Sequence, residues 1–139
     1  MRRYLVPALV LAFVTTVPAA ADETGAETTV ADYLVRWEQI DGLAIRKEIE
    51  ETGTFDATRH PDFTRTIEEM KATANAYRAR IQAERAAGQA PHSCLPETQI
   101  DLSSDNLIPH LRSYAPDEQA NMTLADAFAD LMAKTYPCP

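Results

Sequence analysis

The strongest constraint on the fold is an apolar stripe near the middle of the chain. Apolar side chains recur there at alternating intervals of four and three residues, at Phe63, Ile67, Met70, Ala74, Tyr77 and Ile81. This period places them on one face of an α-helix, with charged residues, Glu69 among them, on the other faces. Pro61 forces an extended conformation at His60, Asp62 is expected to cap the helix, and Pro91 lies beyond its end. The sequence therefore predicts a long amphipathic helix that needs partners to cover its apolar face.

A second helix is predicted upstream, after a cap at Thr28 or Thr29. Its apolar face carries Val30, Tyr33, Leu34, Trp37, Ile40 and Ala44. Gly42 costs a helix about 1 kcal/mol relative to alanine. The segment is therefore expected either to kink or stop near Gly42, or to continue through it to Gly53, which suits the position after a helix end.

Two further helices are predicted in the last third of the chain. One follows Ser103 or Ser104 and carries Leu107, Ile108, Leu111 and Tyr114, with Pro109 expected to bend it or delay its start. The stretch from Ala115 to Glu118 is expected to end this helix and to separate it from the next one. The last helix starts near Asn121 or Thr123 and carries Leu124, Phe128, Leu131 and Thr135, with Met132 beside them.

These patterns predict a small all-α domain of four helices. No segment shows the two-residue alternation of a half-buried strand, and the helical segments are joined by short loops. We expect the helical domain to span residues 29–139. Residues 22–28 are polar and lack periodicity, so a flexible N-terminal tail is expected there.

The start of the chain has the features of a secretory signal peptide. Arg2 and Arg3 precede an apolar run over residues 4–17, and small side chains follow, with cleavage expected between Ala21 and Asp22. The apolar run is shorter than the roughly 20 residues that a membrane-spanning helix needs. The sequence therefore predicts a protein exported by the Sec route, periplasmic or secreted, without a stable membrane anchor.

Export decides how the two cysteines are interpreted. In an oxidising compartment, Cys94 and Cys138 are expected to form a disulfide. Counting both ends, the link closes a loop of 45 residues, for which the chain-entropy model gives about 4 kcal/mol. A redox-active pair would need close spacing such as Cys-x-x-Cys, so a structural role is predicted.

The charge balance excludes some classes of partner. The chain has 13 basic and 21 acidic side chains, a formal charge of −8, and removing the signal peptide takes two arginines with it and leaves −10. Such a surface does not bind the phosphates of a nucleic acid. After this removal, basic side chains outnumber acidic ones in residues 58–88, whereas acids are in excess in residues 22–57 and 89–139. The acidic remainder is either an ordinary solvated surface or a face that attracts a cationic partner.

Groups that could support catalysis do not converge in the sequence. His60, His92 and His110 fall in or near loops with no second ligand type at a metal-binding interval. Asp126 and Asp130 share a helix face, but without an apolar pocket they are interpreted as surface acids. No nucleophile elbow, zinc-protease motif or phosphate loop is present. We expect no enzyme activity, no cofactor and no metal site.

The tryptophan and the methionines have two interpretations. Trp37 could anchor a partner, and Met70, Met122 and Met132 could form a client-binding surface. Because all four belong to predicted helical segments, we interpret them as core residues.

The C-terminal half resembles a known family. Its parts are Cys-Leu-Pro-Glu at residues 94–97, a polar turn, a helix ending in Tyr114 before a proline break, and a last helix closing in Tyr-Pro-Cys at 136–138. This pattern resembles the Rap/Tai family of small periplasmic immunity proteins associated with type VI secretion. Family members commonly carry further cysteines in the N-terminal half, whereas residues 22–93 here contain none.

The resemblance implies an all-helical periplasmic protein that binds and blocks a cell-wall-degrading effector enzyme. Its partner is thus expected to be another protein, with a homodimer as the other option. An alternative is an acid-stress chaperone similar to the HdeA type, because protonating the carboxylates leaves a strongly positive chain. A third alternative is an envelope protein of another role.

Overall fold

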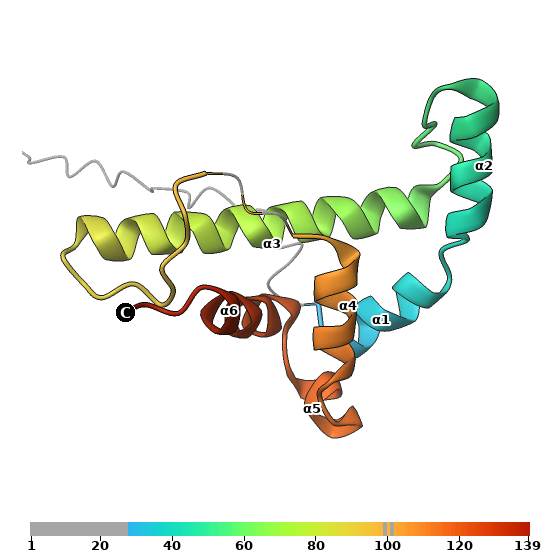
Figure 1. Ribbon diagram of the computed structural model, residues 1–139. Helices are drawn as coiled ribbons and strands as arrows, with labels where there is room; N and C mark the ends of the chain where they lie inside the picture. Colours follow the sequence, from blue (N-terminus) through green and yellow to red (C-terminus); the bar gives the residue numbers. More distant parts are fainter. Residues whose placement is uncertain (1–27, 99, 101) are drawn as a thin grey trace, which may run out of the picture.

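The computed structural model describes residues 28–98, 100 and 102–139, and these residues form six helices and no strand (Figure 1). The all-α fold class predicted from the sequence is therefore confirmed. The helices are α1 (Val30–Glu38), α2 (Gly42–Thr52), α3 (Pro61–Ala86), α4 (Ser104–Arg112), α5 (Pro116–Asn121) and α6 (Leu124–Thr135).

The helix predicted after Thr28 or Thr29 is divided into α1 and α2. Helix α1 ends at Glu38, and Asp41 caps α2 by accepting a hydrogen bond from the backbone N–H of Ala44 at 3.0 Å. Gly42 is thus the first residue of a new helix rather than a kink within one. At the other end of α2, Gly53 adopts a left-handed conformation with φ of 71°, as its predicted role after a helix end requires.

The last third of the chain follows the predicted boundaries with one addition. Ser103 caps α4, and Pro109 lies inside that helix instead of delaying its start. The stretch predicted as a break forms the short helix α5, with Pro116 at its first position, where a missing N–H costs nothing. Helix α6 begins after Thr123 and ends before Tyr136, as expected.

Two helices start from a shared anchor. Thr29 and Thr123 each accept a hydrogen bond at 3.1 Å from the N–H of an aspartate three residues on, Asp32 and Asp126. The two threonines also form an isolated antiparallel bridge. The two helix starts have similar sequences, Thr-Val-Ala-Asp at residues 29–32 and Thr-Leu-Ala-Asp at residues 123–126. Each therefore has the same cap, followed by a buried apolar residue.

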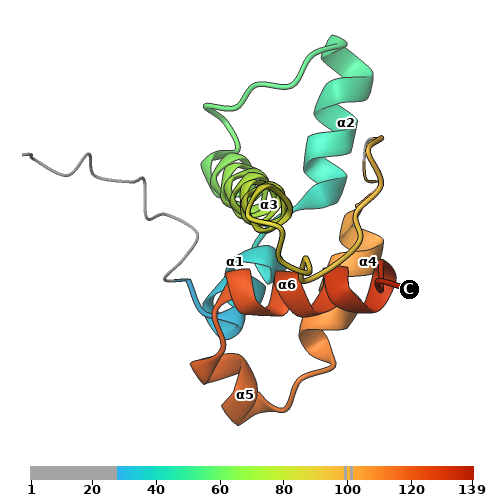
Figure 2. The ribbon, with the colours of Figure 1, turned by 90° about the vertical axis from the view of Figure 1, so that its left-hand side faces the viewer.

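The main core lies on one side of α3. Helix α3 packs against α1 and α6, while α1 also contacts α4 and α5. In Figure 2, which looks nearly along α3, α1, α5 and α6 lie below it. The core includes Val30, Tyr33, Leu34, Tyr77, Ile81, Leu95, Leu107, Ile108, Leu111, Leu124, Phe128, Leu131 and Met132.

The buried face of α3 differs from the predicted stripe in its first half. Tyr77 and Ile81 are buried as expected, and Met70 and Ala74 are partly buried against the core. Toward the N-terminus of α3, however, the buried side chains are Thr66, Glu69 and Thr73. The prediction that Glu69 lies on an outer face is therefore wrong. The reason is that α1, which covers this half of α3, supplies a cationic side chain there.

Helix α2 stands apart from the other helices. Extensive contacts join the other described helices, and α2 takes part in none of them. With the loop that follows it, α2 forms a projection beyond the start of α3, which we call the α2 arm (residues 41–60) (Figure 1). Phe63, at the start of α3, packs edge-to-face against Phe55 of the arm, with ring centroids 5.5 Å apart. The apolar stripe of α3 is thus shared between the core and the arm.

Candidate functional site

The two cysteines form the predicted disulfide. Cys94 and Cys138 are bonded, with their Cα atoms 4.9 Å apart. The backbone N–H of Cys94 also donates to the carbonyl of Tyr136 at 2.9 Å. The bond joins the chain just after α6 to the loop between α3 and α4. It therefore fixes the C-terminus against the core and is structural.

The predicted signal peptide and its cleavage site at Ala21 and Asp22 lie outside the described residues. None of the helices in the described part of the chain combines the length and apolar character needed to span a bilayer.

The side chains weighed as binding anchors belong mainly to the core. Met132 is 1% exposed, and Trp37, Met70 and Met122 are partly buried against the core cluster. Burial leaves little of these side chains available to a partner. Their interpretation as core residues agrees with their positions.

The three histidines lie apart, each with its own partners. His60 contacts the carboxylate of Glu48, at 2.5 Å. The Nδ1 atom of His92 lies 2.9 Å from the hydroxyl of Tyr77. Within residues 28–98, 100 and 102–139, no three metal-ligating side chains gather into a site.

His110 belongs to a small polar cluster between α4 and α6. Its Nε2 atom lies 3.1 Å from the carbonyl of Ala127 and 3.0 Å from the hydroxyl of Tyr114. That hydroxyl donates to Asp130, which also accepts from Lys134 at 2.7 Å. Asp130 is therefore engaged between two helices and is more than a solvated surface acid, whereas Asp126 is exposed beside its Thr123 cap.

Hydrogen bonds and burial shift the pKa values of two residues in this cluster. Hydrogen bonds from Lys134 and then Tyr114 lower the pKa of Asp130 below its usual value. Burial first, and then the hydrogen bond to Asp130, raise the pKa of Tyr114. These shifts keep Tyr114 as the hydrogen-bond donor and Asp130 as the charged acceptor in the contact between them. The cluster joins α4 to α6.

The α2 arm carries three of the four large apolar side chains that are exposed in the described part of the chain, and the fourth, Val35, lies on α1. Leu43 is 77% exposed, Ile49 42% and Phe55 40%. Single exposed apolar residues are common, but three on one projecting element form a candidate binding surface. We call Leu43, Ile49 and Phe55 the arm residues.

The arm is held by a carboxylate that sequence reasoning did not single out. Glu48 is only 9% exposed and pairs with Arg59 at 3.0 Å as well as with His60. This arrangement fixes the end of the arm loop to the inner face of α2. The signal available in the sequence was its spacing from Ile45, since positions three apart share a helix face. The arm therefore presents its apolar residues on a braced support.

Comparisons with known proteins give no relative. No family model, curated protein or solved structure matches this chain.

Proposed function

We propose that this is a non-enzymatic periplasmic binding protein of the immunity type, which docks on a cell-wall-degrading effector and blocks it with the α2 arm. The single observation that carries the proposal is the projecting arm, whose three apolar residues are exposed while Glu48 braces its base. The C-terminal resemblance to Rap/Tai proteins and the disulfide support the same function.

The shape of the arm suits the blocking of an enzyme cleft. A projection enters a concave site more readily than a flat face does, and a few anchoring side chains supply most of the binding energy of an interface. Exposed acids flank the arm residues, including Asp41, Glu50 and Asp56. We therefore expect an effector surface with an apolar pocket and a basic rim.

The test is inhibition of a candidate effector, a cell-wall hydrolase encoded beside this gene. Lysis of purified cell walls is followed with the protein added in increasing amounts. We expect Leu43→Glu and Phe55→Glu to abolish inhibition. Val35→Glu is the matched control, because Val35 is 56% exposed on α1, away from the arm.

The proposal fails if no co-encoded hydrolase is inhibited, or if the Val35 variant loses inhibition as fully as the arm variants. Sedimentation of the protein alone tests the homodimer. If the arm mediates self-association, the two arm variants dissociate the dimer and Val35→Glu leaves it intact.

An acid-stress chaperone is the second candidate, and one observation favours it. Two carboxylates, Glu48 and Glu69, are buried in ion pairs, which protonation would break. The helices would then loosen near pH 3 and expose apolar faces. Circular dichroism and a client-aggregation assay at pH 2–3 test it, and failure to suppress aggregation in acid excludes this function.

A further inference from the structure

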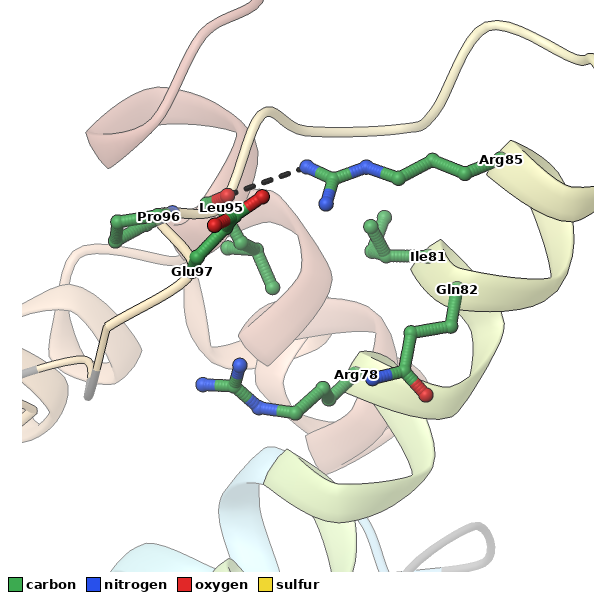
Figure 3. Close-up of a pocket in the computed structure, with 7 residues that line it drawn as sticks. All are labelled: Arg78, Ile81, Gln82, Arg85, Leu95, Pro96 and Glu97. Carbon is green, nitrogen blue, oxygen red and sulfur yellow. Dashed lines mark hydrogen bonds between the residues drawn. The ribbon is translucent and has the colours of Figure 1, made fainter.

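A pocket on the second half of α3 contains two arginines that the proposed function does not use. It has a volume of about 210 Å³ and lies between α3 and the segment 95–97. Figure 3 shows Arg78 and Arg85 extending from α3 toward this segment, on either side of Ile81. The remaining lining is Gln82, Leu95, Pro96 and Glu97.

The two arginines are placed to receive an anion. They are seven residues apart, two helical turns, and so share a face of α3. Arg85 is held in position because its Nη2 donates to the carbonyl of Leu95 at 3.2 Å. Arg78 is partly buried and forms no ion pair with any residue in the described part of the chain. Arg80, by contrast, is paired with Glu84 at 2.8 Å.

The charged pocket continues into an apolar one. A second pocket, of about 140 Å³, shares Arg78 and Leu95 with the first. The rest of its lining is mainly apolar and includes Ala74, Tyr77, Ile100, Leu102 and Phe128. The side chain of Arg78 therefore stands where a positively charged site meets an apolar one.

We propose that these joined pockets bind a carboxylate carried on a short apolar body. Arginine recognises carboxylates through two parallel N–H donors, and the apolar pocket would bury the attached hydrocarbon. Glu97 is the one carboxylate among the described residues that line the charged pocket, so two arginines face it and this lining has a net positive charge. The ligand is either the apolar C-terminal residue of a peptide or a medium-chain fatty acid, since both have this chemistry.

This site does not depend on the proposed function. The arm precedes α3 in the chain and projects past the N-terminal end of this helix. The arginine pocket lies along the second half of α3 (Figure 1). A ligand bound between Arg78 and Arg85 would leave the arm residues free, so either activity can be lost without the other.

The test is titration of the purified, disulfide-bonded protein, monitored by NMR of its backbone amides. The probes are octanoate and a tripeptide ending in leucine, with the same peptide amidated at its C-terminus as the ligand control. We expect shifts at residues 78–85 and 95–97 with at least one free carboxylate and none with the amide. Binding of octanoate alone supports the fatty acid, and binding of the peptide alone supports the C-terminal residue.

Three variants test the residues. Arg78→Gln is expected to weaken binding by about tenfold or more, because it removes a charge-assisted hydrogen bond. Glu97→Gln is expected to tighten it by about threefold by removing the competing charge. Arg80→Gln, on the same helix with the same loss of charge, is the control and should change affinity little.

The proposal is overturned if neither free carboxylate binds at millimolar concentration, or if the amidated peptide binds equally well. It is also overturned if Arg80→Gln weakens binding as much as Arg78→Gln, because the effect would then be one of overall charge.

Discussion

Arg36 of α1 and Glu69 of α3 form an ion pair that joins the two helices next to the start of the described chain. The Glu69 carboxylate is 5% exposed, and the hydroxyl of Thr28 donates to its other oxygen. The Nε of Arg36 is buried and has no hydrogen-bond partner among the described residues. This pair is the reason that a charged residue occupies the inner face of α3.

Removing the buried carboxylate should be strongly destabilising. Glu69→Ala leaves the Arg36 guanidinium, 18% exposed, without its counter-charge, and we expect a loss of about 3 kcal/mol in the free energy of unfolding. Urea unfolding measures it. Glu68→Ala, at an exposed neighbouring position, is the control and should change stability by less than about 0.5 kcal/mol. Equal effects of the two substitutions would contradict a structural role for the pair.

Glu48 should control the order of the α2 arm more than global stability. In Glu48→Gln, the ion pair with Arg59 is lost and His60 no longer contacts a carboxylate, so we expect faster hydrogen exchange of the α2 amides with α3 and α6 unchanged. Glu51→Gln is the matched control, because Glu51 is 65% exposed and lies 3.8 Å from Lys47. Unchanged exchange in Glu48→Gln would show that packing alone holds the arm.

The disulfide should contribute a large part of the stability. Cys94 and Cys138 are 44 positions apart, and reduction is expected to lower the free energy of unfolding by up to about 4 kcal/mol. Thermal unfolding with and without dithiothreitol measures the change. In a Cys94→Ala/Cys138→Ala variant the reductant should have no further effect. An equally stable reduced protein would show that the core alone fixes the C-terminus.

Stability should fall at alkaline pH through Tyr33. Burial first, and then the negative charge of Glu69, raise the pKa of Tyr33 to about 12, against 10.0 for the free side chain. Because the pKa is higher in the folded state, the contribution of Tyr33 is complete below pH 10 and is lost as the pH rises toward 12. We expect a loss of about 1 kcal/mol between pH 9 and pH 11.

Tyr33→Phe isolates this effect, since phenylalanine does not ionise. The variant should lose less stability than the native protein over the same pH range, as measured by urea unfolding at each pH. Parallel losses in the two proteins would assign the alkaline instability to other groups.

Local signals in the sequence were sufficient for the helices and for the covalent link. The caps at Thr29 and Thr123 and the left-handed Gly53 depend on neighbours within a few residues, so they could be predicted. The cap predicted at Asp62 is wrong, because α3 already begins at Pro61 and His60 precedes it. The disulfide followed from the expected compartment and the presence of two cysteines. The candidate site was harder to predict from the sequence, because the burial of Glu48 and the exposure of the arm residues depend on packing between distant segments.

The sequence by itself determined the helical segments other than α5, where most of them begin and end, and which cysteines pair. Only the tertiary structure decided that α2 leaves the core and that the apolar stripe of α3 serves two neighbours. It also decided that Glu69 lies inward, opposite Arg36, which is 33 positions away in the chain. The physical reason is that helical period identifies an apolar face, whereas the burial of a charge depends on a partner brought close by folding.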